Sequence, residues 1–133
     1  MPRLRKPEKL RAADTALVTL IRTTLGVANS AHFGGKLPEL PVYLSGRFKS
    51  TMAWLWTHDD LCGCGKRVPA GTPEYFVFSR AWVARATTDE LYSLSCHELV
   101  HLWQAVHGDD TNHGKHFQEK AAELGLSPFW CRS

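Results

Sequence analysis

The hydrophobic and polar positions of this chain follow two different periods, and the changes of period divide it into helices and strands. In the first quarter, apolar residues recur every three or four positions up to a Gly34-Gly35 pair. This spacing predicts one amphipathic helix that ends before the glycines. Its apolar positions are Leu10, Ala13, Leu17, Leu20, Ile21, Leu25 and Ala28. Three segments rich in aromatic and branched residues follow at 41–45, 49–57 and 75–79, and they are predicted strands.

A second helical pattern starts near Thr87. Thr87 and Glu90 have the spacing of a capping box, in which each side chain accepts a backbone N–H at the start of a helix. Helically spaced apolar residues continue to Val106, and Gly108 is a natural end. The apolar positions are Leu91, Leu94, Leu99, Leu102, Trp103 and Val106.

A C-terminal helix is predicted after the polar turn at 109–112. It carries apolar residues at Phe117, Ala121 and Leu124, and Gly125 ends it. The order of elements indicates an α+β fold with an N-terminal helix, a small three-stranded sheet and two further helices. Short loops between the strands favour antiparallel pairing throughout the sheet.

Length and composition indicate one folded unit. The 133 residues are enough to bury one core, so we expect a single domain over 1–133. Hydrophobic residues make up 44% of the chain and charged residues 22%, and no apolar run approaches the roughly 20 residues that span a bilayer. The first residues lack the apolar core of a secretory signal. We therefore expect a cytoplasmic protein with no membrane partner.

Positive charge is concentrated at the N-terminus, although the formal net charge is only +3. Residues 1–11 form a basic arm that contains Arg3, Arg5, Lys6, Lys9 and Arg11. Such an arm can contact the phosphates of DNA, but a solvated terminus has the same composition, and no aromatic residues interleave with the cations for base stacking. DNA is thus a candidate partner. The sequence does not set the oligomeric state.

The segment 97–101 has the sequence HELVH and lies well inside the second predicted helix. Residues four apart on a helix project from one face, so the imidazoles of His97 and His101 can bind one metal ion. Catalytic zinc takes three protein ligands and keeps a fourth position open. The helical return after the polar turn brings back His113, the leading candidate for the third ligand, and also His116. The sequence therefore predicts one Zn²⁺ ion.

Glu98 lies beside His101 on the same predicted helix. It can reach water at the metal without being a ligand, which is the arrangement that a general base for hydrolysis requires. We therefore predict that Glu98 is the catalytic residue.

Four cysteines raise the question of a second metal site. Cys62 and Cys64 lie in a glycine-rich loop, but structural zinc sites use pairs separated by two to four residues, and here one residue separates them. Cys96 and Cys131 stand alone in the sequence. We expect Cys96 to be a small buried residue, and the sequence disfavours a second zinc.

These motifs together resemble the SprT-like metalloprotease family, whose eukaryotic member is the Spartan protease that degrades proteins crosslinked to DNA. The resemblance covers most of the chain and is carried by the segments 33–38, 41–48, 97–101 and 113–117. The last of these is similar to the family's His-Gly-x-x-Phe element. The resemblance implies a zincin-like domain in which His97, His101 and His113 bind zinc and Glu98 is the base. It also implies that His116 occupies a variable position. We expect no C-terminal zinc ribbon of the kind that many bacterial relatives carry.

The function that we expect is that of a zinc-dependent metalloendopeptidase. It would hydrolyse peptide bonds in a protein substrate with water activated by zinc and Glu98, on DNA-associated or DNA-crosslinked proteins. Two alternatives stay open. One is a non-proteolytic zinc-containing module that binds DNA or protein, although a purely structural site gains nothing from Glu98. The other is a zinc hydrolase of small amides or esters, which predicts an enclosed pocket instead of a groove.

Overall fold

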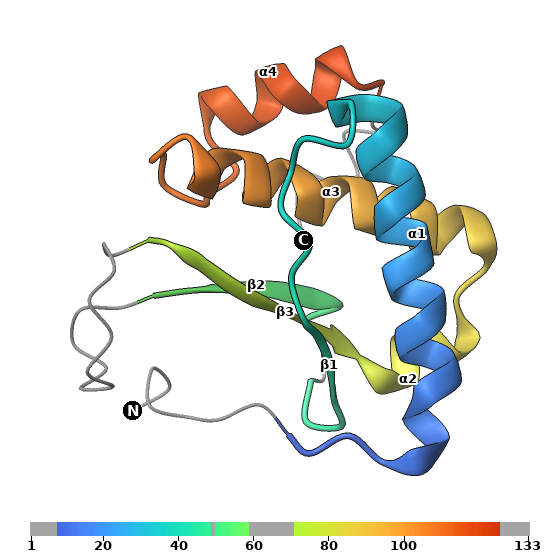
Figure 1. Ribbon diagram of the computed structural model, residues 1–133. Coiled ribbons are helices and arrows are strands. Elements are labelled where there is room, and N and C mark those ends of the chain that lie inside the picture. The colour runs from blue at the N-terminus through green and yellow to red at the C-terminus, as the bar shows by residue number, and fades with distance from the viewer. Residues whose placement is uncertain (1–7, 49, 59–70, 126–133) are drawn as a thin grey trace.

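The computed structural model describes residues 8–48, 50–58 and 71–125, and Figure 1 shows their arrangement. Its elements are the 3₁₀ turn η2 (Ala12–Asp14), α1 (Thr15–Phe33), β1 (Val42–Ser45), β2 (Ala53–Thr57), β3 (Pro73–Ser79), α2 (Arg80–Arg85), α3 (Thr88–Val106) and α4 (Lys115–Glu123). The predicted α+β class is confirmed. Within the described ranges, no helix is long and apolar enough to cross a membrane.

The sheet is mixed, so the prediction of purely antiparallel pairing was wrong. The strand order is β1-β3-β2, with β3 parallel to β1 and antiparallel to β2. A short loop between β1 and β2 does reverse the chain, but reversal does not require the two strands to be neighbours. β3 takes the central position between them, and four consecutive residues at its end, 76–79, are buried there. A strand that is buried on both faces is a poor edge strand.

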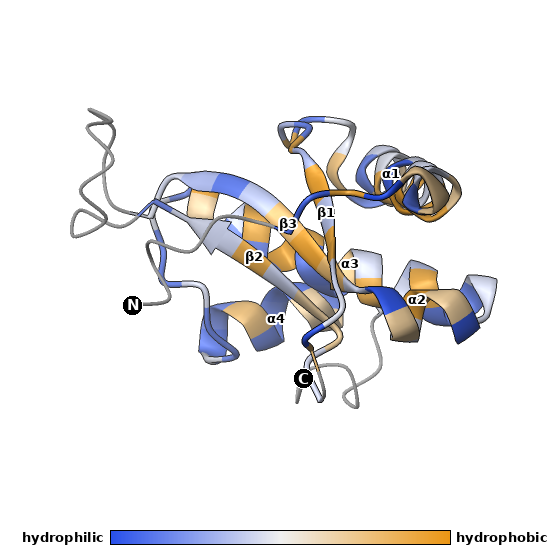
Figure 2. Ribbon diagram, turned by 90° about the horizontal axis from the view of Figure 1, so that it is seen from below, coloured by the Kyte–Doolittle hydropathy of each residue, from blue (hydrophilic) through white to orange (hydrophobic). Residues whose placement is uncertain are grey.

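The core lies between one face of the sheet and the helices. Figure 1 shows α3 along one side of the sheet with α4 beyond it, and α1 packs against α3 and β1. Figure 2 shows hydrophobic residues along β1 and β3, whereas α4 alternates between hydrophilic and hydrophobic positions. Buried side chains from the strands meet those of α1 and α3 in one cluster. Its strand members include Val42, Leu44, Leu55, Phe76 and Phe78. As a result, α3 contacts α1, α4, β2 and β3.

The predicted helix ends agree with the structure in most places. Thr87 and Glu90 form the expected capping box at the start of α3, with each side chain accepting the other residue's backbone N–H. Gly34 ends α1 with φ of 62°, a conformation that favours glycine. The first helix, however, begins at Thr15 instead of near Leu10, and α2 was not predicted from the sequence.

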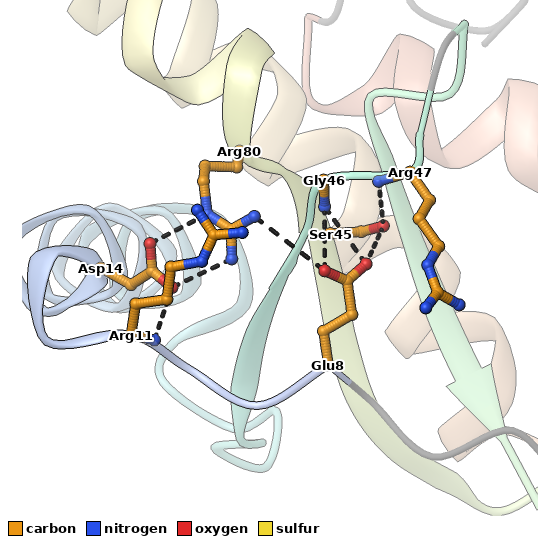
Figure 3. Close-up of polar contacts among 7 residues, drawn as sticks. All are labelled: Glu8, Arg11, Asp14, Ser45, Gly46, Arg47 and Arg80. Carbon is orange, nitrogen blue, oxygen red and sulfur yellow. Dashed lines mark hydrogen bonds and ion pairs between the residues drawn. The ribbon is translucent and has the colours of Figure 1, made fainter.

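A polar network holds the start of the described chain against the sheet (Figure 3). The Glu8 carboxylate accepts hydrogen bonds from Ser45 Oγ, at 2.8 Å, and from the Gly46 backbone. Arg80 donates two hydrogen bonds to the Asp14 carboxylate, at 2.9 and 3.0 Å. This bidentate pair joins the N-cap residue of α1 to the first residue of α2.

The polar network at Glu8 shows where the described part of the predicted basic arm lies. Residues 1–7 lie outside the described residues, whereas Lys9 and Arg11 are exposed. Glu8 is fixed on the sheet by its hydrogen bonds, so the described end of the arm lies on the surface of the fold. Contact with DNA stays a prediction.

Candidate metal centre

Two of the predicted ligands lie on the buried face of α3. His97 and His101 are one turn apart, with ring centroids separated by 4.9 Å. Their exposed fractions are 1% and 9%. A buried imidazole loses its hydrogen bonds to water, so burial of both rings is costly unless other groups bind their nitrogens.

The third predicted ligand, His113, lies in the loop before α4, whose N-cap residue is Gly114. The prediction that His113 belongs to the last helix was therefore wrong. Hydrogen bonds form at this loop both within it and from the exposed Gln118 on α4. The Gly114 N–H donates to Asn112 Oδ1 at 2.9 Å, and Gln118 Nε2 donates to the His113 carbonyl at 3.1 Å. A Cβ atom at position 114 would lie 2.9 Å from Asn112 Oδ1, so a larger residue here would displace that side chain.

The three imidazoles converge through their Nε2 atoms. His113 Nε2 lies 3.2 Å from His97 Nε2 and 3.2 Å from His101 Nε2. A ring N–H can donate to only one of these neighbours, so hydrogen bonding among the rings leaves lone pairs facing each other. Tetrahedral zinc with Zn–N bonds of about 2.0–2.1 Å places its nitrogen ligands about 3.3 Å apart. The donor set thus fits a zinc ion, and the three ligand atoms lie within 4.8 Å of one another.

The protonation of His101 also suits a metal ligand. Its Nδ1 lies 2.9 Å from Gln104 Oε1, an atom that only accepts, so Nδ1 carries the proton and Nε2 keeps its lone pair. Burial lowers the pKa of His101 to about 4, and it also lowers the pKa of His113. Both rings are therefore neutral near pH 7, as metal binding requires.

Glu98 is buried beside the imidazoles, with an exposed fraction of 3%. One carboxylate oxygen lies 3.9 Å from His97 Nε2, and the other, Oε1, has no hydrogen-bond partner among the residues that the structure describes. Burial raises the pKa of this carboxyl to about 8. An unsatisfied buried carboxyl next to three ligand nitrogens fits a site for a cation and a reacting water.

Phe117 supports the histidine cluster from α4. It is fully buried, and its ring centroid lies 4.9 Å from His97, 4.8 Å from His101 and 4.9 Å from His113. The same ring therefore packs against all three predicted ligands and fixes how α4 approaches α3.

A groove of about 530 Å³ runs beside this cluster. Its lining includes the three histidines, Glu98 and the 50–55 segment, which contains most of β2. Ser50, Trp54 and Asn112 line the groove and are exposed, so it opens to solvent. The site is therefore reachable by a ligand larger than water.

The other histidines lie elsewhere. His116 is exposed, and its Nδ1 lies 3.5 Å from Asp109 Oδ2, so it is outside the cluster and His113 is the better third ligand. His107 is also exposed, whereas His32 contacts the Tyr92 hydroxyl at 2.9 Å. Buried His58 has its Nδ1 3.8 Å from Glu74.

Only one of the four cysteines, Cys96, lies within the residues that the structure describes. Cys96 is fully buried, as predicted, and burial raises the pKa of its thiol to about 11. Cys62, Cys64 and Cys131 lie outside the described residues. The disfavoured second zinc site therefore stays a prediction.

Two site residues were not identified from the sequence. Gln104 contacts His101, and Asn112 shapes the turn before His113. The spacing of Gln104, three residues after His101 on a helix, places it on the same face and was the available signal. Asn112 gave no comparable signal, because its role depends on the conformation of the loop.

These features define a class of protein, namely an α+β domain whose central helix carries two histidines and a buried glutamate while the following loop supplies a third histidine. The family model described as the SprT-like family matches residues 21–129, which is most of the chain. The protein therefore belongs to the SprT-like family. No curated protein and no solved structure matches it.

Proposed function

We propose that this protein is a zinc-dependent endopeptidase with His97, His101 and His113 as the metal ligands and Glu98 as the catalytic base. The observation that carries the proposal is the convergence of three Nε2 atoms next to a buried carboxyl in a solvent-accessible groove. Three neutral nitrogen ligands leave a fourth position for water, which is the pattern of a catalytic zinc site.

The roles of the residues follow from their chemistry. A bound zinc ion supplies acidification of water and polarisation of the scissile carbonyl. Glu98 accepts the proton of the attacking water on a carboxylate oxygen and then delivers it to the nitrogen of the leaving amine. A neighbouring cation lowers the pKa of a carboxyl, so Glu98 is ionised and ready to act as a base when the site is loaded.

The position of β2 supports a polypeptide substrate. β2 pairs with β3 on one side, and its other edge has no strand partner in the described part of the chain. Ala53, Trp54 and Leu55 of the same strand line the groove. An extended peptide can add to such an edge through main-chain hydrogen bonds, which would hold its backbone beside Glu98. A groove of this kind also favours a protein over a small amide or ester.

We further propose DNA-associated proteins as the substrates. The support is the set of five cations in residues 1–11 and the membership of the SprT-like family. A protein carrying this arm would gain affinity for DNA through phosphate contacts that weaken with salt.

Cleavage assays with the zinc-loaded protein test both proposals. The substrates are an unstructured protein and a DNA-binding protein, each with and without single-stranded or double-stranded DNA. Glu98→Gln removes the base, and Glu119→Gln on the exposed surface of α4 is the matched control. We expect the wild type and the control to cleave and Glu98→Gln to retain zinc without cleaving.

The reactions with and without DNA distinguish the endopeptidase proposal from the proposal that the substrates are DNA-associated proteins. Glu98-dependent cleavage that increases with DNA supports both, and Glu98-dependent cleavage that is indifferent to DNA overturns the second. A zinc-loaded wild type that cleaves neither substrate would overturn the endopeptidase and favour a binding module.

A further inference from the structure

Gln104 is a buried polar side chain whose two ends contact different parts of the metal centre. It lies on α3 with an exposed fraction of 1%. Its Oε1 lies 2.9 Å from His101 Nδ1, and its Nε2 donates to the Asn112 carbonyl at 3.1 Å. One side chain thus connects a helical ligand with the residue before the loop ligand, His113.

The orientation of this amide is fixed by chemistry. The Asn112 carbonyl can only accept, so the NH₂ group of Gln104 must face it. The amide oxygen then faces His101, and Nδ1 of that ring must carry the proton. A flipped amide would place two acceptors together at one end. The contact with Asn112 therefore determines the tautomer of His101.

We propose that Gln104 is a positioning residue that couples two metal ligands, holding His101 with Nε2 unprotonated and holding the loop that presents His113. The inference rests on the zinc binding of the proposed function. Removing the side chain would leave the His101 tautomer free and loosen the loop at once. Partners of this kind are typically worth about 10–100-fold in metal affinity.

The backbone of Gln104 has a separate role, which makes side-chain variants informative. Its carbonyl accepts hydrogen bonds from the Asp109 N–H, at 2.8 Å, and from the His107 N–H, at 3.2 Å. These bonds end α3 and begin the loop, and they do not depend on the side chain at position 104. A variant at this position therefore keeps the backbone turn while losing the contacts of the amide.

Zinc titrations in competition with a chromophoric chelator provide the first test. Gln104→Met replaces the amide with an apolar chain of similar length, and we expect its zinc affinity to fall about 10–100-fold. Gln118→Met is the matched control, because Gln118 also donates to the loop, at the His113 carbonyl, but is exposed. Water can replace an exposed hydrogen bond, so we expect less than about a threefold change.

The tautomer of His101 in the zinc-free protein provides a second readout, measured from the ¹⁵N shifts of the imidazole. We expect Nδ1–H in the wild type and in Gln104→Glu, which keeps an acceptor for His101 but loses the donor to Asn112. A mixture of tautomers is expected in Gln104→Met. The zinc affinity of Gln104→Glu should lie between that of the wild type and that of Gln104→Met. Gln104→Glu also keeps the test usable if Gln104→Met fails to fold.

The outcomes separate the two proposals. A wild type that binds no zinc overturns the proposed function. A wild type that binds zinc while Gln104→Met matches it in affinity and tautomer overturns only the positioning role. Equal losses in Gln104→Met and Gln118→Met would also overturn it, because they would indicate general support of the loop.

Discussion

Replacement of Glu98 by glutamine should change the stability of the zinc-free protein in a way that depends on pH. The buried carboxyl has its pKa raised to about 8 from an ordinary value of 4.5, and the cause is burial. In the unfolded chain the same carboxyl ionises above about pH 4.5. Between these two values the unfolded state releases a proton that the folded state retains. The free energy of unfolding of the wild type therefore falls as pH rises through this window.

The magnitude follows from the difference in pKa. Each pH unit within the window is worth about 1.4 kcal/mol. From pH 5 to pH 7, the wild type should lose about 2–3 kcal/mol of unfolding free energy relative to Glu98→Gln, whose amide does not titrate. This is a large share of the roughly 5–15 kcal/mol that stabilises a typical domain. The unfolding free energy of zinc-free Glu98→Gln, measured relative to that of the wild type, should therefore be higher at pH 7 than at pH 5.

Urea denaturation of both chelator-treated proteins at pH 5 and pH 7 measures this effect. The difference between the proteins at pH 5 reports how well the amide fits the site, and only the change of that difference with pH reports ionisation. The three histidines are present in both proteins, so their contribution to the pH dependence cancels to first order. A difference that stays the same at both pH values would refute the reasoning about the buried carboxyl.

Three further predictions concern the surroundings of the site and the N-terminal network. Gly114→Ala should displace Asn112 Oδ1, break its hydrogen bond and lower zinc affinity about fivefold, which corresponds to about 1 kcal/mol; chelator competition measures this. Phe117→Ala should lower the unfolding free energy by about 3–5 kcal/mol, measured in urea, because the fully buried ring packs on three imidazoles. Asp14→Asn should lower the melting temperature at neutral pH. The Arg80 guanidinium holds the pKa of Asp14 at about 2 instead of 3.8, so this deficit should shrink as pH falls through that range; a deficit unchanged at pH 2 would contradict the ion pair.

Local patterns in the sequence predicted the features that depend on neighbouring residues. The capping box at Thr87 and Glu90, the glycine end of α1 and the helical spacing of His97 and His101 each involve atoms within a few residues of one another. Such features depend on local backbone geometry, which the identities of neighbouring residues determine. For the same reason, the helix bearing HELVH was predicted at almost its observed bounds.

Features that depend on distant residues were predicted less well. The parallel pairing of β1 with β3 depends on which strand is most apolar, because that strand takes the centre of the sheet. The short helix α2 was not predicted, since its six residues carry little periodic signal. His113 was selected by its motif, but its place in a loop follows from tertiary contacts such as the hydrogen bond from Gln104 on α3 to the carbonyl of the neighbouring Asn112.

The middle of α3 buries several polar side chains that carry a cost in stability. Ser95, His97, Glu98, His101 and Gln104 are all buried on this helix. Apolar residues at these positions would fill the same space without the desolvation that buried polar groups incur. Gln104 and His101 satisfy each other in part, but Glu98 Oε1 and Ser95 Oγ have no hydrogen-bond partner within the described ranges. A metal ion that binds the folded state would offset part of this cost, because its binding free energy adds to the stability of the fold. Stability and metal affinity should therefore rise and fall together in variants of the three histidines. Glu98→Gln should behave differently, because we expect it to retain zinc while the stability of its zinc-free fold loses the pH dependence that the buried carboxyl causes.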